Sequence, residues 1–281
     1  MLTEAYLPRG AAPKRSLGQN FLVDAGIAHR MVDAMGLAGD ETVVEIGGGR
    51  GAMTELLAAR ARRLVVVEID RALAAGLADS FGARDSVEVV SGDILDFDPA
   101  ARLGLRPEEK AVVFGNIPYY ASSPILIWLA EHTASVSRAY LTMQREVADR
   151  LTASPGSKEY GSITVRLAYA AASRRVFSIP PDAFRPRPKV VSSYVELAFH
   201  ERPPVDVPDA PLLFRVVRAA FAQRRKTLRN TLALRPEADA ALGLGEIAAS
   251  SGIDLGRRGE TLSLAEFARL ATVIAEARWR A

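Results

Sequence analysis

The hydrophobic pattern of the first two hundred residues alternates short apolar runs with segments of helical length. Runs rich in Val, Ile and Leu predict strands at 42–46, 64–69, 87–90, 111–114, 139–143, 175–179 and 190–199. Each of the first four runs is followed by a helical or loop segment. This alternation is typical of an α/β fold whose parallel sheet is covered on both faces.

The pattern changes at 201–208, a stretch with three prolines that reads as a linker. Beyond it the apolar spacing is helical at 212–222, near 227–234 and at 264–277. We therefore predict two domains, residues 1–203 with a flexible basic arm at 1–15, and a helical domain at 204–281.

A glycine-rich stretch, Gly47-Gly-Gly-Arg-Gly51, follows the first predicted strand directly. Glycine permits positive φ and lets backbone N–H groups come close to a ligand, so this strand and loop predict a nucleotide site. The loop lacks the Gly-Lys-Ser/Thr ending of a phosphate-binding loop, which argues against ATP hydrolysis. It does satisfy G-x-G-x-x-A, with Glu68 as the ribose-binding acid, so an NAD-dependent oxidoreductase stays open.

Ligands of parallel sheets sit beyond the carboxyl ends of the strands, and three of the first four ends carry a polar side chain. Glu68 lies 21 positions after Gly47, a distance suited to the two ribose hydroxyls of a nucleotide. Asp93 suits the amino group of adenine, because a carboxylate only accepts hydrogen bonds, although it equally suits a helix cap. Asn116 follows the fourth strand.

The stretch Asn116-Ile-Pro-Tyr119 has an obvious use on a nucleobase. An adenine amine is a poor nucleophile because its lone pair is delocalised into the ring. Two acceptors on its hydrogens, the Asn116 side-chain oxygen and the Pro118 carbonyl, would favour the pyramidal amine that can attack a sulfonium methyl. Tyr119 would stack on the extruded base and Phe184 could cover its other face. This is catalysis by positioning.

Composition narrows the function classes. The chain has 281 residues, 49% of them hydrophobic and 25% charged, as in globular proteins. No run approaches the roughly 18 apolar residues of a membrane span, and the N-terminus lacks the pattern of a secretory signal. With no cysteine and three scattered histidines, we expect no metal site and a cytoplasmic protein.

Positive charge is clustered, although the net charge is only +3. Seven basic and no acidic residues fall between 211 and 235, and we expect part of this tract, Arg224, Arg225, Lys226 and Arg229, to lie on a helix. A second cluster includes Arg187 and Lys189. Such local charge on a nearly neutral chain predicts a polyanionic partner, with these residues as RNA contacts.

These features resemble the ribosomal RNA adenine dimethyltransferases of the KsgA type over nearly the whole chain. The matching stretches are 16–22, 45–54, 67–70, 92–93, 115–119, 155–161 and 184–190, with Ser192. The resemblance implies a Rossmann-like, seven-stranded S-adenosylmethionine-dependent methyltransferase sheet with a small all-helical C-terminal domain. It also implies transfer of two methyl groups to each of two adjacent adenosines in the 3′-terminal hairpin loop of small-subunit (16S) rRNA, leaving S-adenosylhomocysteine.

Residue by residue, the resemblance places one set around S-adenosylmethionine: Asn20, Leu22, Gly47, Gly49, Glu68, Asp93 and Asn116. It places Asn116, Pro118, Tyr119 and Phe184 around the target base. Two departures, Ile117 for the usual leucine and Tyr120 for a smaller or polar residue, imply a slightly different base pocket. The implied partner is small-subunit rRNA within a pre-30S particle, met by a monomer with a role in small-subunit biogenesis and no membrane contact.

Other hypotheses remain. Large-subunit rRNA methyltransferases of the antibiotic-resistance type share most cofactor motifs, but Leu17-Gly18 and the loop at 155–161 favour the small-subunit type. The NAD-dependent oxidoreductase predicts protection by NAD rather than by S-adenosylmethionine. A non-enzymatic assembly factor on the same fold would keep its role without Asn116.

Overall fold

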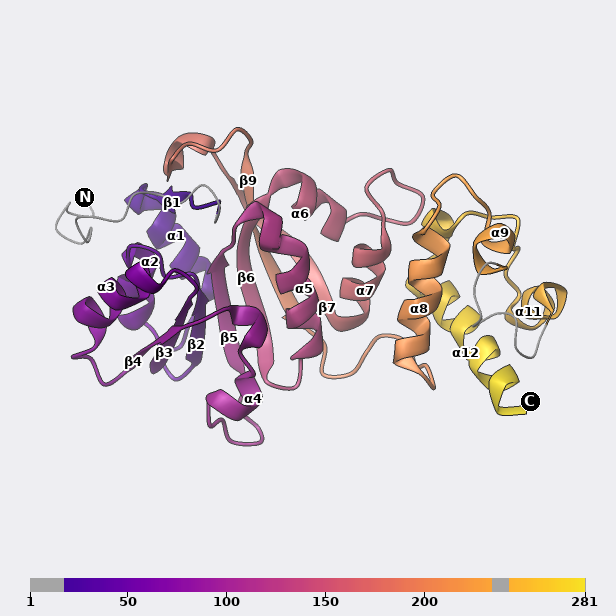
Figure 1. Ribbon diagram of the computed structural model, residues 1–281, viewed down its shortest axis with the longest axis horizontal. Coiled ribbons are helices and arrows are strands. Elements are labelled where there is room, and N and C mark those ends of the chain that lie inside the picture. The colour runs from indigo at the N-terminus through magenta and orange to yellow at the C-terminus, as the bar shows by residue number, and fades with distance from the viewer. Residues whose placement is uncertain (1–17, 234–242, 281) are drawn as a thin grey trace. The chain divides into compact units, whose positions relative to one another are not determined.

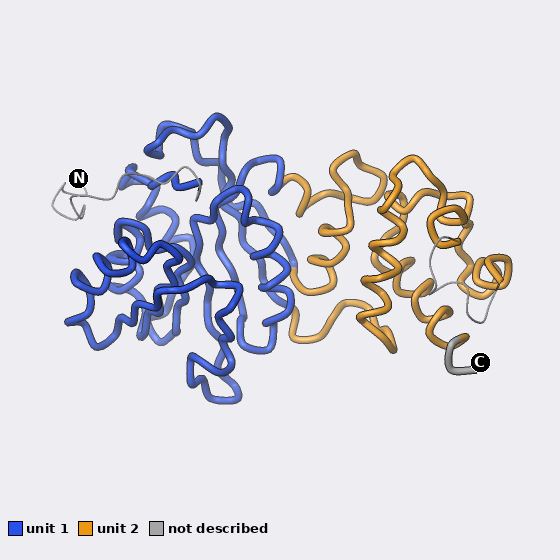
Figure 2. The backbone as a smooth tube through the Cα atoms, viewed as in Figure 1, with its two compact units in different colours: residues 1–148, 172–199 blue, residues 149–171, 200–281 orange. Residues whose placement is uncertain are grey.

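The computed structural model describes residues 18–233 and 243–280 (Figure 1). The described residues pack into two compact units, one within 1–148 and 172–199 and the other within 149–171 and 200–281 (Figure 2). The basic arm at 1–15 lies outside the described residues. No helix in the described ranges is long and apolar enough to cross a membrane.

The first unit is built on a seven-stranded sheet in the order β4-β3-β2-β5-β6-β9-β7. Strands β2 to β6 run parallel, and β9 pairs antiparallel with β6. The strands are β2 (Thr42–Ile46), β3 (Arg63–Glu68), β4 (Val87–Ser91), β5 (Ala111–Asn116), β6 (Val136–Gln144), β7 (Ala171–Ile179) and β9 (Ser192–Phe199). Because β3 and β5 flank β2, the strand order reverses there, and ligands bind at the carboxyl ends beside such a switch point.

Helices cover both faces of this sheet. On one face α1, α2 and α3 bury their apolar residues in a core that includes Phe114, Tyr140 and Tyr194. On the other, α5 buries Trp128, whose indole N–H donates to the Phe97 carbonyl at 3.1 Å. The helices are α1 (Ala25–Met35), α2 (Ala52–Ala58), α3 (Arg71–Phe81), α4 (Pro99–Arg102), α5 (Ser122–Glu131) and α6 (Arg145–Leu151).

The α/β class and all seven strands of the main sheet are confirmed, with shifted ends. Strand β6 begins three residues before the predicted 139, and β9 begins at Ser192 rather than 190. The sequence pattern missed a second, two-stranded sheet in which β1 (Phe21–Leu22) pairs antiparallel with β8 (Phe184–Arg185). Two-residue strands carry no alternation, so only the fold reveals them.

The second unit is helical, with α7 (Ser162–Ala170), α8 (Ala210–Phe221), α9 (Leu228–Leu232), α11 (Leu244–Ser251) and α12 (Leu264–Arg280). The second unit differs from the predicted domain 204–281, because it also contains residues 149–171 and begins again at 200. Tyr160 and Val165 share its core with Leu213 and Phe267, and the Tyr160 hydroxyl donates to the Leu262 carbonyl at 2.8 Å.

The basic tract of this unit is not helical as predicted. Arg224, Arg225 and Lys226 lie in the turn between α8 and α9, and only Arg229 lies on a helix. The expectation of a helix here was wrong: these charged residues carry no apolar periodicity, and they fall between the helical spacings at 212–222 and near 227–234. The predicted end of the following helix at 234 lies outside the described residues.

Candidate functional site

The glycine loop after β2 forms one wall of a cavity at the carboxyl ends of the strands. Gly47 and Gly49 have φ of 74° and 57°, which L side chains rarely adopt. A Cβ on Gly49 would come within 3.2 Å of the Phe21 ring. The Gly47 N–H donates to the Val67 carbonyl at 2.8 Å, which ties the loop to the end of β3. Backbone is thereby exposed to the cavity without side chains in the way.

Gly48 must be glycine because a larger side chain would not fit in the core, and not because of its φ angle. A Cβ there would lie 2.5 Å from Val66 Cγ1 and 2.8 Å from Leu77 Cδ1, both in the core. We expect Gly48→Ala to lower the free energy of unfolding by about 1–3 kcal/mol, as overpacking of a core does. Gly92→Ala is the matched control, because nothing lies within 4 Å of its Cβ position. Equal urea midpoints for the two variants would contradict this assignment.

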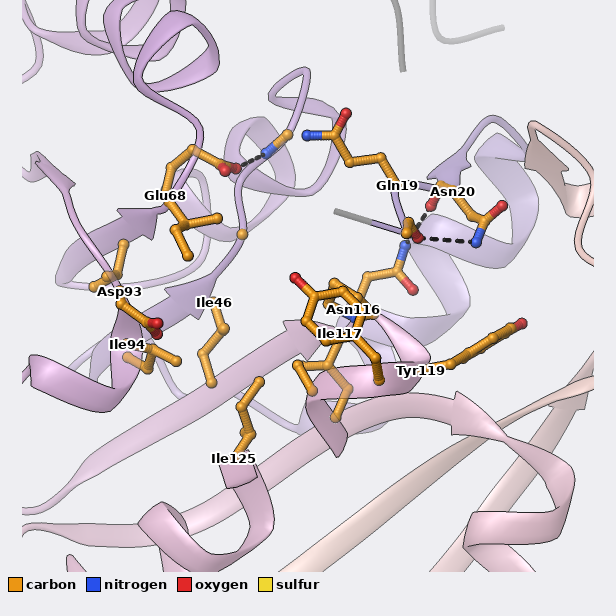
Figure 3. A pocket seen from close by; sticks show the side chains of 18 of the residues that line it. Gln19, Asn20, Ile46, Glu68, Asp93, Ile94, Asn116, Ile117, Tyr119 and Ile125 are labelled. Atoms are coloured by element: carbon orange, nitrogen blue, oxygen red, sulfur yellow. Dashed lines mark hydrogen bonds between the residues drawn. The ribbon is translucent and has the colours of Figure 1, made fainter. Parts of the chain in front are cut away.

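Glu68 ends β3 as a buried carboxylate, 3% exposed, that lines the cavity. Its Oε2 accepts from Gly49 N–H at 2.9 Å (Figure 3). Its Oε1 accepts from Asp70 N–H at 2.9 Å. Burial raises the pKa of Glu68, while these two hydrogen bonds act in the opposite direction. A carboxylate has about four lone-pair sites, so each oxygen keeps one for a ribose hydroxyl.

Asp93 and a group of apolar side chains form the next part of the cavity. Asp93 Oδ1 accepts from Leu95 N–H at 3.0 Å, so it caps the short helical turn after β4, and it also lines the cavity. Both uses weighed from the sequence are therefore compatible. Ile46, Ile69, Ile94, Leu95 and Ile125 line the same region and make an apolar slot of the kind that receives a flat ring.

Asn116 lies across the cavity from Glu68 and Asp93, at the end of β5 (Figure 3). Its Nδ2 donates to the Asn20 carbonyl at 3.2 Å, and Asn20 Nδ2 donates to the Gly18 carbonyl at 3.1 Å. Since the amide nitrogen is engaged, the Asn116 oxygen is the atom left to accept a hydrogen bond. Nearby, Gln19 Nε2 donates to Asp70 Oδ2 at 3.3 Å and joins this segment to the end of β3.

Tyr119 and Phe184, the two aromatic residues predicted to flank the target base, both line the cavity. The Tyr119 hydroxyl lies 3.0 Å from Ser192 Oγ, and Ser192 is buried at the start of β9, so the ring is held at both ends. Phe184 is buried and also lines the cavity. The Pro118 carbonyl accepts from Ala121 N–H at 3.0 Å, and a carbonyl oxygen has a second lone pair for another donor.

All but one of the predicted cofactor and base residues line this single cavity. The exception is Leu22, which is packed in the core and pairs with Phe184 in the two-stranded sheet. It lies beside the residues that line the site rather than in the cavity itself. The four basic residues predicted in the helical domain belong to the second unit, while Arg187 and Lys189 are exposed in the first.

The sequence interpretation missed Phe21 and the apolar residues next to the acidic strand ends. Phe21 lines the cavity, and the Arg50 guanidinium stacks 4.7 Å from its ring centre. Ile69 and Leu95 are exposed large hydrophobic residues at the cavity. The sequence could have indicated them, because Ile69 directly follows Glu68 and Leu95 comes two residues after Asp93, positions where a solvated loop would be polar.

Comparison with known proteins identifies the family. The model of the family "Ribosomal RNA adenine dimethylase" matches residues 10–270. The chain belongs to this family. A ribosomal RNA small subunit methyltransferase A of Geobacillus thermodenitrificans is 43% identical over 277 residues, covering 97% of this chain and 94% of that protein.

Solved structures agree with the fold. A dimethyladenosine transferase from Plasmodium falciparum superposes with a TM-score of 0.77 at 22% identity, covering 92% of this chain and 98% of that one. The 23S rRNA methyltransferase ErmE superposes with a TM-score of 0.65 at 25% identity, covering 91% and 100%. The family makes the protein an S-adenosylmethionine-dependent methyltransferase, so the oxidoreductase alternative is not supported.

The cavity fits this cofactor. Glu68 offers acceptors for a ribose, Asp93 lies beside an apolar slot suited to adenine, and Gly47 and Gly49 leave room for an amino-acid chain. The cofactor supplies an electrophilic methyl group on a sulfonium sulfur. Among the described residues, no group of three or more His, Asp and Glu side chains is placed to hold a metal ion.

Glu45, on β2 just before the glycine loop, is an acid without access to solvent. It is 1% exposed and accepts a hydrogen bond from Thr54 Oγ1 at 2.7 Å. Burial raises the pKa of Glu45 to about 8; the Thr54 hydrogen bond lowers it, and the nearby Glu68 charge raises it further. At neutral pH the side chain is therefore mostly protonated and ties β2 to α2.

This raised pKa predicts a pH-dependent stability. Between the ordinary value of 4.5 and about 8, the folded state keeps a proton on Glu45 that the unfolded chain has lost. The free energy of unfolding is expected to fall as the pH rises through this window. Glu45→Gln keeps an acceptor for Thr54 and has no proton to lose, so it should flatten the decline in urea unfolding. Glu88→Gln, an exposed control, should leave the slope as in the wild type; a wild-type slope in Glu45→Gln would refute the assignment.

Proposed function

We propose that this methyltransferase transfers two methyl groups to the exocyclic amine of each of two adjacent adenosines in the 3′-terminal hairpin loop of small-subunit rRNA. The observation that carries the proposal is the grouping of Asn116, Pro118, Tyr119 and Phe184 against the cofactor cavity. The 43% identity to a small subunit methyltransferase A supports the choice of subunit.

The chemistry follows from the acceptors at the end of β5. The Asn116 oxygen and the Pro118 carbonyl would take the two amine hydrogens of a base extruded from the RNA. The nitrogen lone pair is then freed from the ring and directed at the methyl carbon. Tyr119 and Phe184 would flank the base, and such stacking is worth roughly 1–3 kcal/mol per base. No covalent enzyme intermediate is needed.

The substrate assignment is tested by incubating the protein with labelled S-adenosylmethionine and undermethylated small subunits. Label should appear in dimethyladenosine of the small-subunit rRNA. Undermethylated large subunits, offered in parallel, should stay unlabelled. Label confined to the large subunit, or absent from adenosine, would overturn the proposal. We further propose that the protein acts as a cytoplasmic monomer on a pre-30S particle, which sucrose-gradient co-sedimentation would test.

The exposed basic turn of the second unit should contribute to RNA affinity. Arg225, Lys226 and Arg229 are exposed, whereas Arg224 already donates to the Lys158 carbonyl and lies 3.6 Å from Glu260. If about five phosphates are neutralised, log K should fall with log salt at a slope of roughly −3.5 to −4.5.

Removing two of these charges should flatten that slope. Arg225→Ala combined with Lys226→Ala is expected to reduce its magnitude by about 1.4–1.8. Filter binding of small-subunit rRNA between 50 and 300 mM salt, roughly the range in which the release of counterions dominates, measures it. Arg102→Ala, in the first unit, serves as the control. A slope unchanged by the double substitution would place the RNA elsewhere.

A further inference from the structure

Tyr120 is an exposed aromatic residue at the edge of the cavity. It is 60% exposed, the highest value among the exposed large hydrophobic side chains in the described part of the chain. It nevertheless lines the same cavity as Tyr119 and Phe184. Leaving so large a ring in water forgoes the stabilisation of burial, and exposed aromatic surface beside a site commonly marks a contact.

One side of the Tyr120 ring has the backbone of Gly18 beside it. Tyr120 lies in the short helical turn Tyr119–Ala121, just before α5. Gly18 lies beside it: a Cβ added there would be in ordinary van der Waals contact, 3.4 Å from Tyr120 Cδ1 and 3.5 Å from Pro118 Cβ. Gly18 also has φ of 56°, which favours glycine. A ring already held against a wall loses little further freedom when a ligand stacks on it.

The aromatic residues at the cavity differ in their exposure to solvent. The Tyr119 hydroxyl is hydrogen-bonded to Ser192 and Phe184 is buried, and the proposed function places the target base beside these two rings. Tyr120 is the next residue along the chain and is open to solvent. Arg187 and Lys189, in the segment after β8, are also exposed and could meet backbone phosphates. The nucleotide next to the target adenosine in the RNA chain must lie outside the cavity, beside these exposed residues.

We propose that Tyr120 is a second base-binding subsite, which stacks on the nucleotide next to the target adenosine. This inference rests on the proposed function, in which that neighbour is itself an adenosine awaiting methylation. Stacking suits this role because every base has a π-face, so the same ring can hold either neighbour in turn. An isolated adenosine would lack this contact.

Three variants separate stacking from other contacts. Tyr120→Ala should raise KM for undermethylated small subunits on the order of ten- to a hundredfold, the loss expected for one stacked base. Tyr120→Leu, apolar but not aromatic, should recover only part of that loss. Tyr120→Phe keeps the ring and should restore KM to near the wild-type value. The Kd for S-adenosylmethionine should change less than about twofold in each variant.

Fluorescence reports the stacking directly. A hairpin RNA with 2-aminopurine beside the target adenosine should be quenched by the wild type and by Tyr120→Phe, but not by Tyr120→Ala. A KM for Tyr120→Ala within twofold of the wild type would overturn the proposal. So would a raised Kd for S-adenosylmethionine with unchanged KM, because the ring would then belong to the cofactor site. Failure of the proposed function is distinguishable, since the wild type itself would label no adenosine.

Discussion

Replacing Asn116 by alanine is expected to lower the single-turnover rate of methyl transfer by about 10²–10³, the usual effect of deleting one positioned hydrogen-bonding group that acts in the transition state. The substitution removes the oxygen proposed to accept an amine hydrogen. It also removes the Nδ2 that donates to the Asn20 carbonyl at 3.2 Å. The rate is measured with the enzyme in excess over undermethylated small subunits and with labelled S-adenosylmethionine at saturation.

Asn116→Asp separates these two losses. The carboxylate keeps an acceptor but cannot donate to Asn20, and it places negative charge against that carbonyl. If orientation by Asn20 matters, Asn116→Asp should be nearly as slow as Asn116→Ala; if only the acceptor matters, it should be faster. Binding of S-adenosylmethionine, followed by calorimetry, should weaken less than the rate falls. A single-turnover rate within tenfold of the wild type in Asn116→Ala would remove this residue from the chemical step.

Sequence patterns predicted the sheet well because its central strands β2, β3 and β5 are buried on both faces. A run such as Val65-Val-Val67 has no polar position, and the end of β3 is marked by the change to Glu68 and Asp70. The positions at strand ends were predictable for the same reason. In a parallel sheet the carboxyl ends meet at one edge, so Glu68, Asp93 and Asn116 had to come close.

What the sequence could not show were the contacts made by residues far apart along the chain. The bond from Asn116 to Asn20 joins β5 to a segment 96 positions earlier. The pairing of Leu22 with Phe184 is similarly remote, and it explains why Leu22 belongs to the core beside the site. The turn at Arg224 was wrongly predicted as a helix, although its charged residues carry no apolar period.

The buried position of Glu45 was also beyond sequence reasoning, although the residue opens the matching stretch 45–54. Its consequence concerns Glu68, because the charge of Glu68 adds to burial in raising the pKa of Glu45. Of the two acids, Glu68 lines the cavity and can meet ligand hydroxyls, whereas Glu45 stays in the core and binds Thr54.

Glu68→Ala is expected to weaken binding of S-adenosylmethionine by about 10²–10⁴-fold. Each hydrogen bond to a charged acceptor contributes roughly 1.5–3 kcal/mol, and two ribose hydroxyls are lost together. Truncation also leaves Gly49 N–H and Asp70 N–H without the carboxylate that accepts from them at 2.9 Å, which loosens the glycine loop. Titration calorimetry gives the Kd, and circular dichroism checks that the variant is folded.

Two comparisons make this prediction sharp. Glu88→Ala removes an exposed carboxylate from the neighbouring strand β4, where it pairs with Arg63, and should leave the Kd within about twofold, since exposed ion pairs contribute little. Sinefungin or S-adenosylhomocysteine, which have the same ribose, should lose affinity for Glu68→Ala by a similar factor, whereas methionine alone should not. Equal losses for methionine would mean that the substitution acts through the glycine loop and not through the ribose, because only the nucleoside carries the two hydroxyls.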